Sequence, residues 1–153
     1  MKLPESTEWA LHCTVSVAQL AGAPASTARL ATHFALPPTY LAKQLALLVR
    51  AGVLTGTTGP KGGFRLARPS SEITVLDVVE AVDGGTDPYQ CREIRQQGRG
   101  ALEPEQCREP CILAQTMRTA HEAWRSSLAS VTVADLIAAL PAWAPDRTRR
   151  LLG

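Results

Sequence analysis

Aromatic residues and cysteines are scarce in this sequence, and it has no long apolar run. Only 5% of its 153 residues are aromatic and four are cysteines. A chain of this length buries roughly two-thirds of its unfolded surface on folding without disulfide bonds. The cysteines are therefore available as metal ligands or reactive thiols. The longest uncharged stretch, residues 9–28, is broken by polar residues, a glycine and a proline, which excludes a membrane span. The first eight residues contain two acids and a proline instead of a secretion signal, and we expect a cytoplasmic protein.

Charge is divided unevenly along the chain. Residues 1–69 carry seven basic and two acidic side chains, a net +5, whereas residues 70–153 carry nine basic and twelve acidic ones, a net −3. A basic N-terminal half is typical of proteins that bind a polyanion such as DNA. An ordinary solvated basic face is the alternative, and the motifs have to decide between the two.

Helix signals dominate the first fifty residues. Their patterns predict a helix over Glu8–Ala21 capped by Ser6 or Thr7, a short one over Thr27–Ala35 capped by Ser26, and a third over Pro38–Arg50. Glycines and prolines mark the joints between them. The result is a compact trihelical unit.

A β-hairpin is predicted directly after these helices. Two β-prone runs, Val53–Thr58 and Phe64–Ala67, flank a glycine-rich basic loop at residues 59–63, and a short helix follows over Ile73–Val82. A hairpin in this place is typical of the wing of a winged helix. The predicted fold class is therefore mainly α with a small β-hairpin, with a winged helix-turn-helix DNA-binding domain over residues 1–82.

The third predicted helix is the expected recognition helix, because the second helix of a helix-turn-helix enters the major groove. Its leucines at positions 41, 45 and 48 share one face, which we expect to be buried. The opposite face and the wing then supply the expected DNA contacts, which are Thr39, Tyr40, Lys43, Gln44, Lys61 and Arg65.

Residues 83–110 read as a long functional loop, and a long helix follows it. Residues 111–140 are predicted to form this helix and a short terminal helix, and residues 141–153 a flexible tail. The apolar stripe of the long helix packs either inside the chain or against its copy in a homodimer. That stripe consists of Leu113, Met117, Ala120, Trp124, Leu128 and Val131.

The cysteines are candidate metal ligands. Cys107 and Cys111 are separated by three residues, a spacing that lets two thiolates converge on one metal or cluster. Cys111 lies near a helix N-terminus, whose dipole stabilises a thiolate. Cys91 is either a third ligand or a bystander, and Cys13 is expected to be a small buried hydrophobe. Two incidental thiols at positions 107 and 111 are the alternative.

Three segments, residues 41–54, 59–67 and 73–82, resemble winged-helix repressors of the IscR and NsrR type. Residues 111–113 and 131–136, with Trp124 between them, resemble the end of the same family. The resemblance covers most of the chain and implies a homodimer with an iron-sulfur cluster. That family typically uses three closely spaced cysteines and one other ligand, but Cys91 lies too far from Cys107 for this pattern.

The N-terminal residues are similar to those of a redox-responsive branch of the family, RsrR, which binds a 2Fe-2S cluster through cysteine, histidine and glutamate. This resemblance implies Glu8 and His33 of one subunit and Cys107 and Cys111 of the other as ligands, with Trp9 as a switch residue. His12 stands four residues after Glu8 on the same helical face, and it is the rival to His33.

The sequence thus predicts a homodimeric transcription repressor whose affinity for an operator in double-stranded DNA depends on the redox state of a 2Fe-2S cluster. A 4Fe-4S sensor of nitric oxide or cluster status, using Cys91, Cys107, Cys111 and Glu8, is the first alternative. A cluster-free thiol switch or a zinc-binding interaction protein is the second. We expect no enzymatic activity, because no nucleophile is paired with a base and residues 59–63 do not form a phosphate loop. We also expect no membrane role, because the longest uncharged stretch is broken by polar residues.

Overall fold

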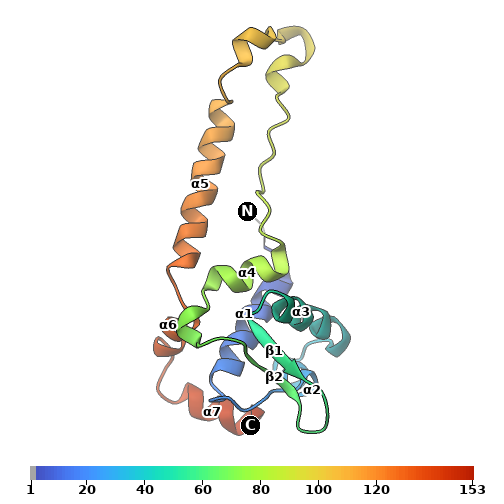
Figure 1. The fold of residues 1–153 in the computed structure, drawn as a ribbon, viewed down its shortest axis with the longest axis vertical. Helices are drawn as coiled ribbons and strands as arrows, with labels where there is room; N and C mark the ends of the chain where they lie inside the picture. The colour runs from blue at the N-terminus through green and yellow to red at the C-terminus, as the bar shows by residue number, and fades with distance from the viewer. Residues whose placement is uncertain (1–2) are drawn as a thin grey trace. The chain divides into compact units, whose positions relative to one another are not determined.

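The computed structural model describes residues 3–153, which form two compact units (Figure 1). One unit consists of residues 86–127. The other combines residues 3–85 with residues 128–153, so the C-terminal part of the chain returns to the N-terminal domain. This organisation differs from the predicted one, in which the N-terminal domain ends at residue 82 and takes nothing from the C-terminal part.

Three helices open the larger unit: α1 (Glu5–Ala18), α2 (Thr27–Phe34) and α3 (Pro38–Arg50). The range predicted for α3 is confirmed, and the one predicted for α2 is one residue too long because Ala35 takes a left-handed conformation. The Ser26 hydroxyl accepts the backbone N–H of Arg29 at 3.2 Å as the expected cap. The prediction for α1 is wrong by three residues at each end. Its N-cap is Pro4, and it stops because Ala21 (φ 49°) and Gly22 (φ 90°) take left-handed conformations.

The core of this unit lies where the three helices meet. Leu41, Leu45 and Leu48 are fully buried, as their spacing predicts. Cys13 is also fully buried, which confirms its expected role as a small hydrophobe. Burial raises the pKa of the Cys13 thiol to about 12, so this cysteine stays protonated.

The predicted hairpin is confirmed. Strands β1 (Leu54–Thr57) and β2 (Gly63–Leu66) pair antiparallel. Phe64 also exchanges two backbone hydrogen bonds with Ala25, at 2.8 and 3.1 Å, which connects strand β2 to the segment between α1 and α2. This approach requires glycine at position 63, because a Cβ there would lie 2.7 Å from the Ala25 backbone.

Two short helices hold the two chain segments of the larger unit together. They are α4 (Val75–Asp83) and α6 (Val133–Ala138), and the 3₁₀ turn η1 (Ser70–Glu72) precedes α4. Each begins with a threonine–aspartate capping box, Thr74 with Asp77 and Thr132 with Asp135. The two caps lie side by side, because Val75 N–H donates to the carbonyl of Val131 at 2.8 Å. The reciprocal bond at 2.8 Å joins residues 133 and 73, so α6 is part of the winged-helix unit.

The expectation of a flexible tail over residues 141–153 is wrong. Residues 144–152 form helix α7 (Ala144–Leu152), which contacts α2. Leu152 is fully buried in the core. Arg29 donates to the carbonyls of Leu152 and Gly153 at 3.0 and 2.9 Å, and these long-range bonds account for an ordered end that local composition does not indicate.

The smaller unit carries the predicted loop and most of the long helix α5 (Ile112–Ala129). Before α5 the backbone forms three 3₁₀ turns, η2 (Ile94–Gln96), η3 (Gly98–Gly100) and η4 (Pro104–Cys107). Within the described residues, α5 has no buried side chain, and Leu113 and Met117 of its apolar stripe are 64% and 42% exposed. Among residues 3–153, no helix has the length and apolar character that crossing a membrane requires.

Candidate functional site

Helix α3, the predicted recognition helix, presents most of the predicted DNA contacts. Thr39, Tyr40 and Lys43 are exposed. The prediction for Gln44 is wrong, because this residue is only 8% exposed. It lies three residues after Leu41 and four before Leu48, so the helical period turns it toward the core.

The wing places its two predicted cations differently. Lys61 is exposed in the loop at the end of the hairpin. Arg65 donates to the carbonyl of Gly22 at 2.8 Å and to the hydroxyl of Thr57 at 3.3 Å, so it braces the hairpin. Both residues line a cavity of about 520 Å³ that Arg29 and Gly153 also line, and Arg29 donates there to the carbonyl of Gly153.

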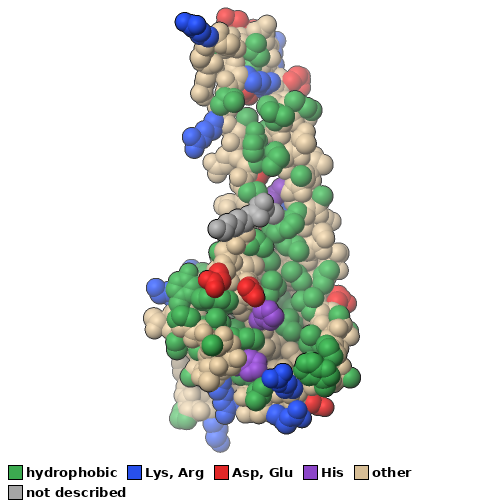
Figure 2. Space-filling view, turned by 180° about the vertical axis from the view of Figure 1, so that it is seen from behind, with side chains coloured by type: hydrophobic (Ala, Val, Ile, Leu, Met, Phe, Trp, Pro, Cys, Tyr) green, Lys and Arg blue, Asp and Glu red, His purple; other side chains and the backbone are tan. Residues whose placement is uncertain are grey.

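Glu8 and Trp9 lie on the face of α1 that fronts a cavity of about 310 Å³. His12 lines the same cavity, as do Glu5, Phe34 and Leu36. Figure 2 shows acidic and histidine side chains gathered together on one face of the protein. Glu8 and His12 therefore share a pocket, as their spacing along α1 predicts.

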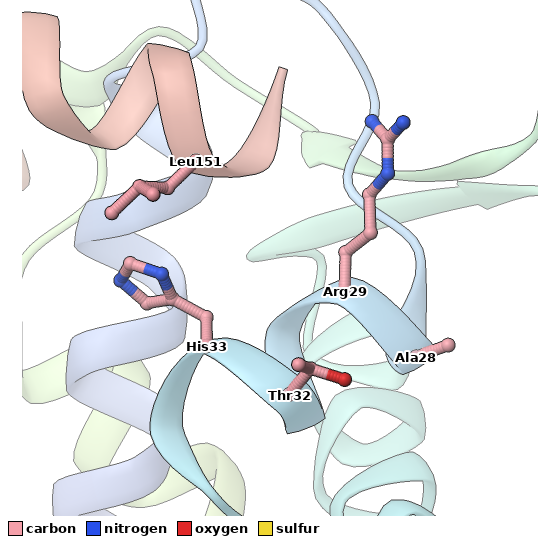
Figure 3. A pocket seen from close by; sticks show the side chains of 5 residues that line it. All are labelled: Ala28, Arg29, Thr32, His33 and Leu151. Atoms are coloured by element: carbon pink, nitrogen blue, oxygen red, sulfur yellow. The ribbon is translucent and has the colours of Figure 1, made fainter.

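His33 lines a different cavity, of about 490 Å³, between α2 and the C-terminal helix. Figure 3 shows its imidazole beside Leu151 of α7, with Arg29 on the same helix as His33. Burial, and to a lesser extent the charge of Arg147, lower the pKa of His33 and favour the neutral imidazole that binds metals.

The Phe34 ring contacts both histidines. Its centroid lies 4.6 Å from that of His33 and 5.7 Å from that of His12. The structure therefore places both candidate histidines around one aromatic ring, and His12 is the one that shares the cavity of Glu8.

Trp9 connects this pocket to the recognition helix. Its ring contacts the ring of Tyr40 edge to face, with centroids 5.4 Å apart and an interplanar angle of 82°. Tyr40 belongs to the first turn of α3, where a recognition helix reads base edges. The residue next to Glu8 is therefore in direct contact with the predicted DNA-reading surface.

The two candidate cysteine ligands lie in the smaller unit. Cys107 ends η4, Cys111 directly precedes α5, and both are partly exposed. The backbone N–H groups of Ala114 and Leu113 lower the pKa of Cys111, and Arg95 adds a smaller contribution. The exposed Cys91 lines a cavity of about 390 Å³ together with Cys111.

No three histidine, cysteine or acidic residues among residues 3–153 are grouped closely enough to hold a metal ion. Glu8, His12 and His33 belong to the larger unit, whereas Cys107 and Cys111 belong to the smaller one. The donor types suit an iron-sulfur cluster, which takes four protein ligands.

Sequence reasoning missed several side chains that surround these ligands. Phe34 and Leu151 were not singled out, because contacts between separate helices leave no local pattern. Arg95 was missed as well, although two arginines and a glutamate within four residues of Cys91 could have drawn attention to this part of the loop.

The trihelical unit, its wing and the exposed recognition helix define a winged-helix DNA-binding regulator. The chain belongs to the Rrf2 family of iron-dependent transcriptional regulators, whose family model matches residues 3–139. It is similar to the HTH-type transcriptional repressor NsrR of Streptomyces coelicolor, with 28% identity over 141 residues, which are 91% of this chain and 90% of that protein.

Two solved structures show the same fold. CymR, the global cysteine regulator of B. subtilis, superposes with a TM-score of 0.69 at 22% identity, covering 92% of this chain and 99% of that one. IscR of T. potens gives a TM-score of 0.67 at 21% identity, with 90% and 87% covered. These comparisons confirm a winged-helix transcriptional regulator of the family that the sequence resembles.

Proposed function

We propose that this regulator is a homodimeric repressor whose DNA affinity follows the redox state of a 2Fe-2S cluster held between subunits. The contact between Trp9 and Tyr40 is the observation that carries the proposal, because it joins the residue beside Glu8 to the recognition helix. A displacement of Glu8 would therefore reach the predicted DNA-reading surface through its neighbour Trp9 and the ring of Tyr40.

Glu8 and His33 of one subunit would complete the ligand set of Cys107 and Cys111 from the other. The lowered pKa values of Cys111 and His33 support this set, because both groups then favour the deprotonated form that binds iron. His12 is the competing imidazole, since it lines the cavity of Glu8. When bound, a 2Fe-2S cluster accepts and releases one electron.

The response of the protein would begin at the oxygen and nitrogen ligands. A Glu8 carboxylate or His33 imidazole that takes up a proton binds metal less well, so its side chain is free to move. Trp9 is the next residue along α1, and its displacement would change the support of the Tyr40 ring. The two states must then differ in DNA affinity for the signal to be read.

The homodimer would be built on α5. The first half of its apolar stripe, Leu113, Met117 and Ala120, is exposed in one chain, and a helix with such a face needs a partner surface. A two-fold dimer would also present two recognition helices to the two halves of a symmetric operator.

The test begins with protein purified without oxygen. We expect about two irons and two sulfides per cluster, reversible bleaching with dithionite, and different affinities of the two forms for operator DNA. Glu8→Gln and His33→Ala should each change the absorption spectrum, whereas Glu5→Gln should not, although Glu5 lines the same cavity as Glu8. A normal cluster and normal redox response in both ligand variants would refute the ligand set. A changed absorption spectrum in His12→Ala, with a normal spectrum in His33→Ala, would assign the histidine ligand to His12.

The second candidate is a 4Fe-4S sensor that uses Cys91 as a third thiolate. Its supporting observation is that Cys91 and Cys111 line one cavity. About four irons per cluster, together with loss of iron in Cys91→Ser, would establish this function in place of the first. An iron-free protein from oxygen-free preparation would favour the thiol-switch or zinc alternatives.

A further inference from the structure

An ion pair holds the loop that carries Cys107 and Cys111. Arg95 donates from Nη2 to Oε2 of Glu93 at 2.7 Å and from Nε to Oε1, which is a bidentate pair. The same Nη2 donates to the backbone carbonyl of Glu109 at 3.2 Å, and Glu109 lies between the two cysteines. The guanidinium therefore fastens the turn at residues 93–96 to the cysteine loop.

The guanidinium also belongs to the surroundings of the two cysteines. The turn η2, which contains Arg95, packs against η4, which ends at Cys107. Arg95 and Cys111 line the same cavity. The pKa of Arg95 is raised, first by its hydrogen bond to Glu93 and further by the negative charges of the two thiolates. One fixed positive charge thus faces both predicted cysteine ligands.

Glu93 is held in an unfavourable conformation to make this pair. Its φ of 49° lies in the left-handed region, which non-glycine residues avoid. Such conformations persist where the surrounding contacts determine them. The bidentate bond to Arg95 is a contact of this kind, so Glu93 orients the guanidinium toward the loop.

We propose that Arg95, oriented by Glu93, is a positioning residue of the cysteine site. It orders the loop between Cys107 and Cys111 and supplies the positive charge that stabilises an anionic group bound by these sulfurs. Insofar as that group is a 2Fe-2S cluster, this inference rests on the proposed function. The reduced cluster carries one more negative charge than the oxidised one, so Arg95 favours the reduced state.

The first experiment uses the cluster-free full chain with Cys91→Ser, in which Cys107 and Cys111 are the accessible thiols and Cys13 is buried. We would measure rate constants with a dianionic disulfide, 5,5′-dithiobis(2-nitrobenzoate), and a neutral one, 4,4′-dithiodipyridine. Loss of the guanidinium in Arg95→Gln should lower the ratio of the anionic to the neutral rate constant by about threefold or more at low salt. A purely structural disturbance would change both rates together and leave the ratio unchanged.

Two variants serve as controls. Arg95→Lys keeps the charge and should restore most of the ratio. Arg108→Gln removes an equal charge from an exposed arginine between the same two cysteines, and the ratio should stay within about 1.5-fold of the parent because that side chain is more fully solvated. Glu93→Gln keeps the Arg95 charge but releases its orientation, so it tests the pair if Arg95→Gln fails to fold by circular dichroism.

The second experiment measures the reduction potential of the cluster-bound dimer. In Arg95→Gln the reduced-to-oxidised ratio at a fixed potential should fall about tenfold, which is a shift of roughly 59 mV for one electron. Equal effects of Arg95→Gln and Arg108→Gln, or no effect of Arg95→Gln on either readout, would overturn the inference. If no cluster assembles in the parent chain, the proposed function fails, and the thiol rate ratio alone decides the role of Arg95.

Discussion

The docked C-terminal helix leads to a quantitative prediction. Leu152 is 0% exposed and belongs to the core, whereas its neighbour Leu151 is 55% exposed. Truncating a fully buried leucine to alanine removes apolar contact and leaves a cavity, which costs about 2–5 kcal/mol of the free energy of unfolding. The same truncation at Leu151 should cost less than about 1 kcal/mol, because most of its surface is already in water.

Thermal and urea unfolding of cluster-free protein at one fixed concentration would check this difference. For a domain of about 150 residues, each kcal/mol lowers Tm by roughly 2–4 °C, so Leu152→Ala should lower Tm by about 4–20 °C. Arg29 would also lose well-placed acceptors at the end of α7, since it donates to the Leu152 and Gly153 carbonyls.

A second readout follows His33. Burial and Arg147 lower its pKa, and both influences depend on α7. Undocking of α7 in Leu152→Ala should therefore return the pKa, measured by NMR titration, toward 6.5. Equal unfolding free energies for the two leucine variants, with an unchanged His33 titration, would refute a docked α7 and restore the expectation of a flexible tail.

Three further predictions concern the dimer, the wing and a helix cap. Leu113→Glu should shift the proposed dimer toward monomer in analytical ultracentrifugation, whereas Ser126→Glu, off the apolar stripe, should not. Lys61→Ala should weaken DNA binding and reduce the slope of log K against log salt by about one. Thr132→Ala should cost about 0.5–2 kcal/mol at neutral pH. Thr132 lowers the Asp135 pKa, so the part of the effect that comes from the Asp135 carboxylate is present above pH 3.8 and lost as pH falls through the folded-state pKa, and acid unfolding should show a smaller penalty.

Local signals were sufficient for much of the winged helix. Ser26 and Pro38 set the starts of α2 and α3, and the leucine spacing identified the buried face of α3. The error at Gln44 arose because a polar residue was assigned to solvent although it borders that buried face. Residues 144–152 were misjudged for a different reason, since the contacts that order them come from Arg29, more than a hundred residues away.

Local sequence patterns predicted less of the candidate site than of the fold. The spacing of Cys107 and Cys111 identifies a thiolate pair, but the choice of Glu8 and His33 came from a family resemblance. Helical spacing alone connects Glu8 with His12, and the structure places these two residues at one cavity. Arg95 and Glu93 are two residues apart in an irregular turn, a spacing with no periodic signature, so their pairing emerges only from the fold.

A ligand set divided between two chains makes cluster binding and dimerisation one linked equilibrium. Among residues 3–153 no three suitable donors group together, and the proposal takes two of the four ligands from each subunit. By linkage, a cluster that strengthens the dimer is itself retained more tightly by the dimer, by the same factor. Loss of a Glu8 or His33 bond would then weaken operator binding by two routes, through Trp9 and Tyr40 and through dissociation of the dimer. Only the first route persists at protein concentrations well above the dimer Kd, so the concentration dependence of DNA binding separates them.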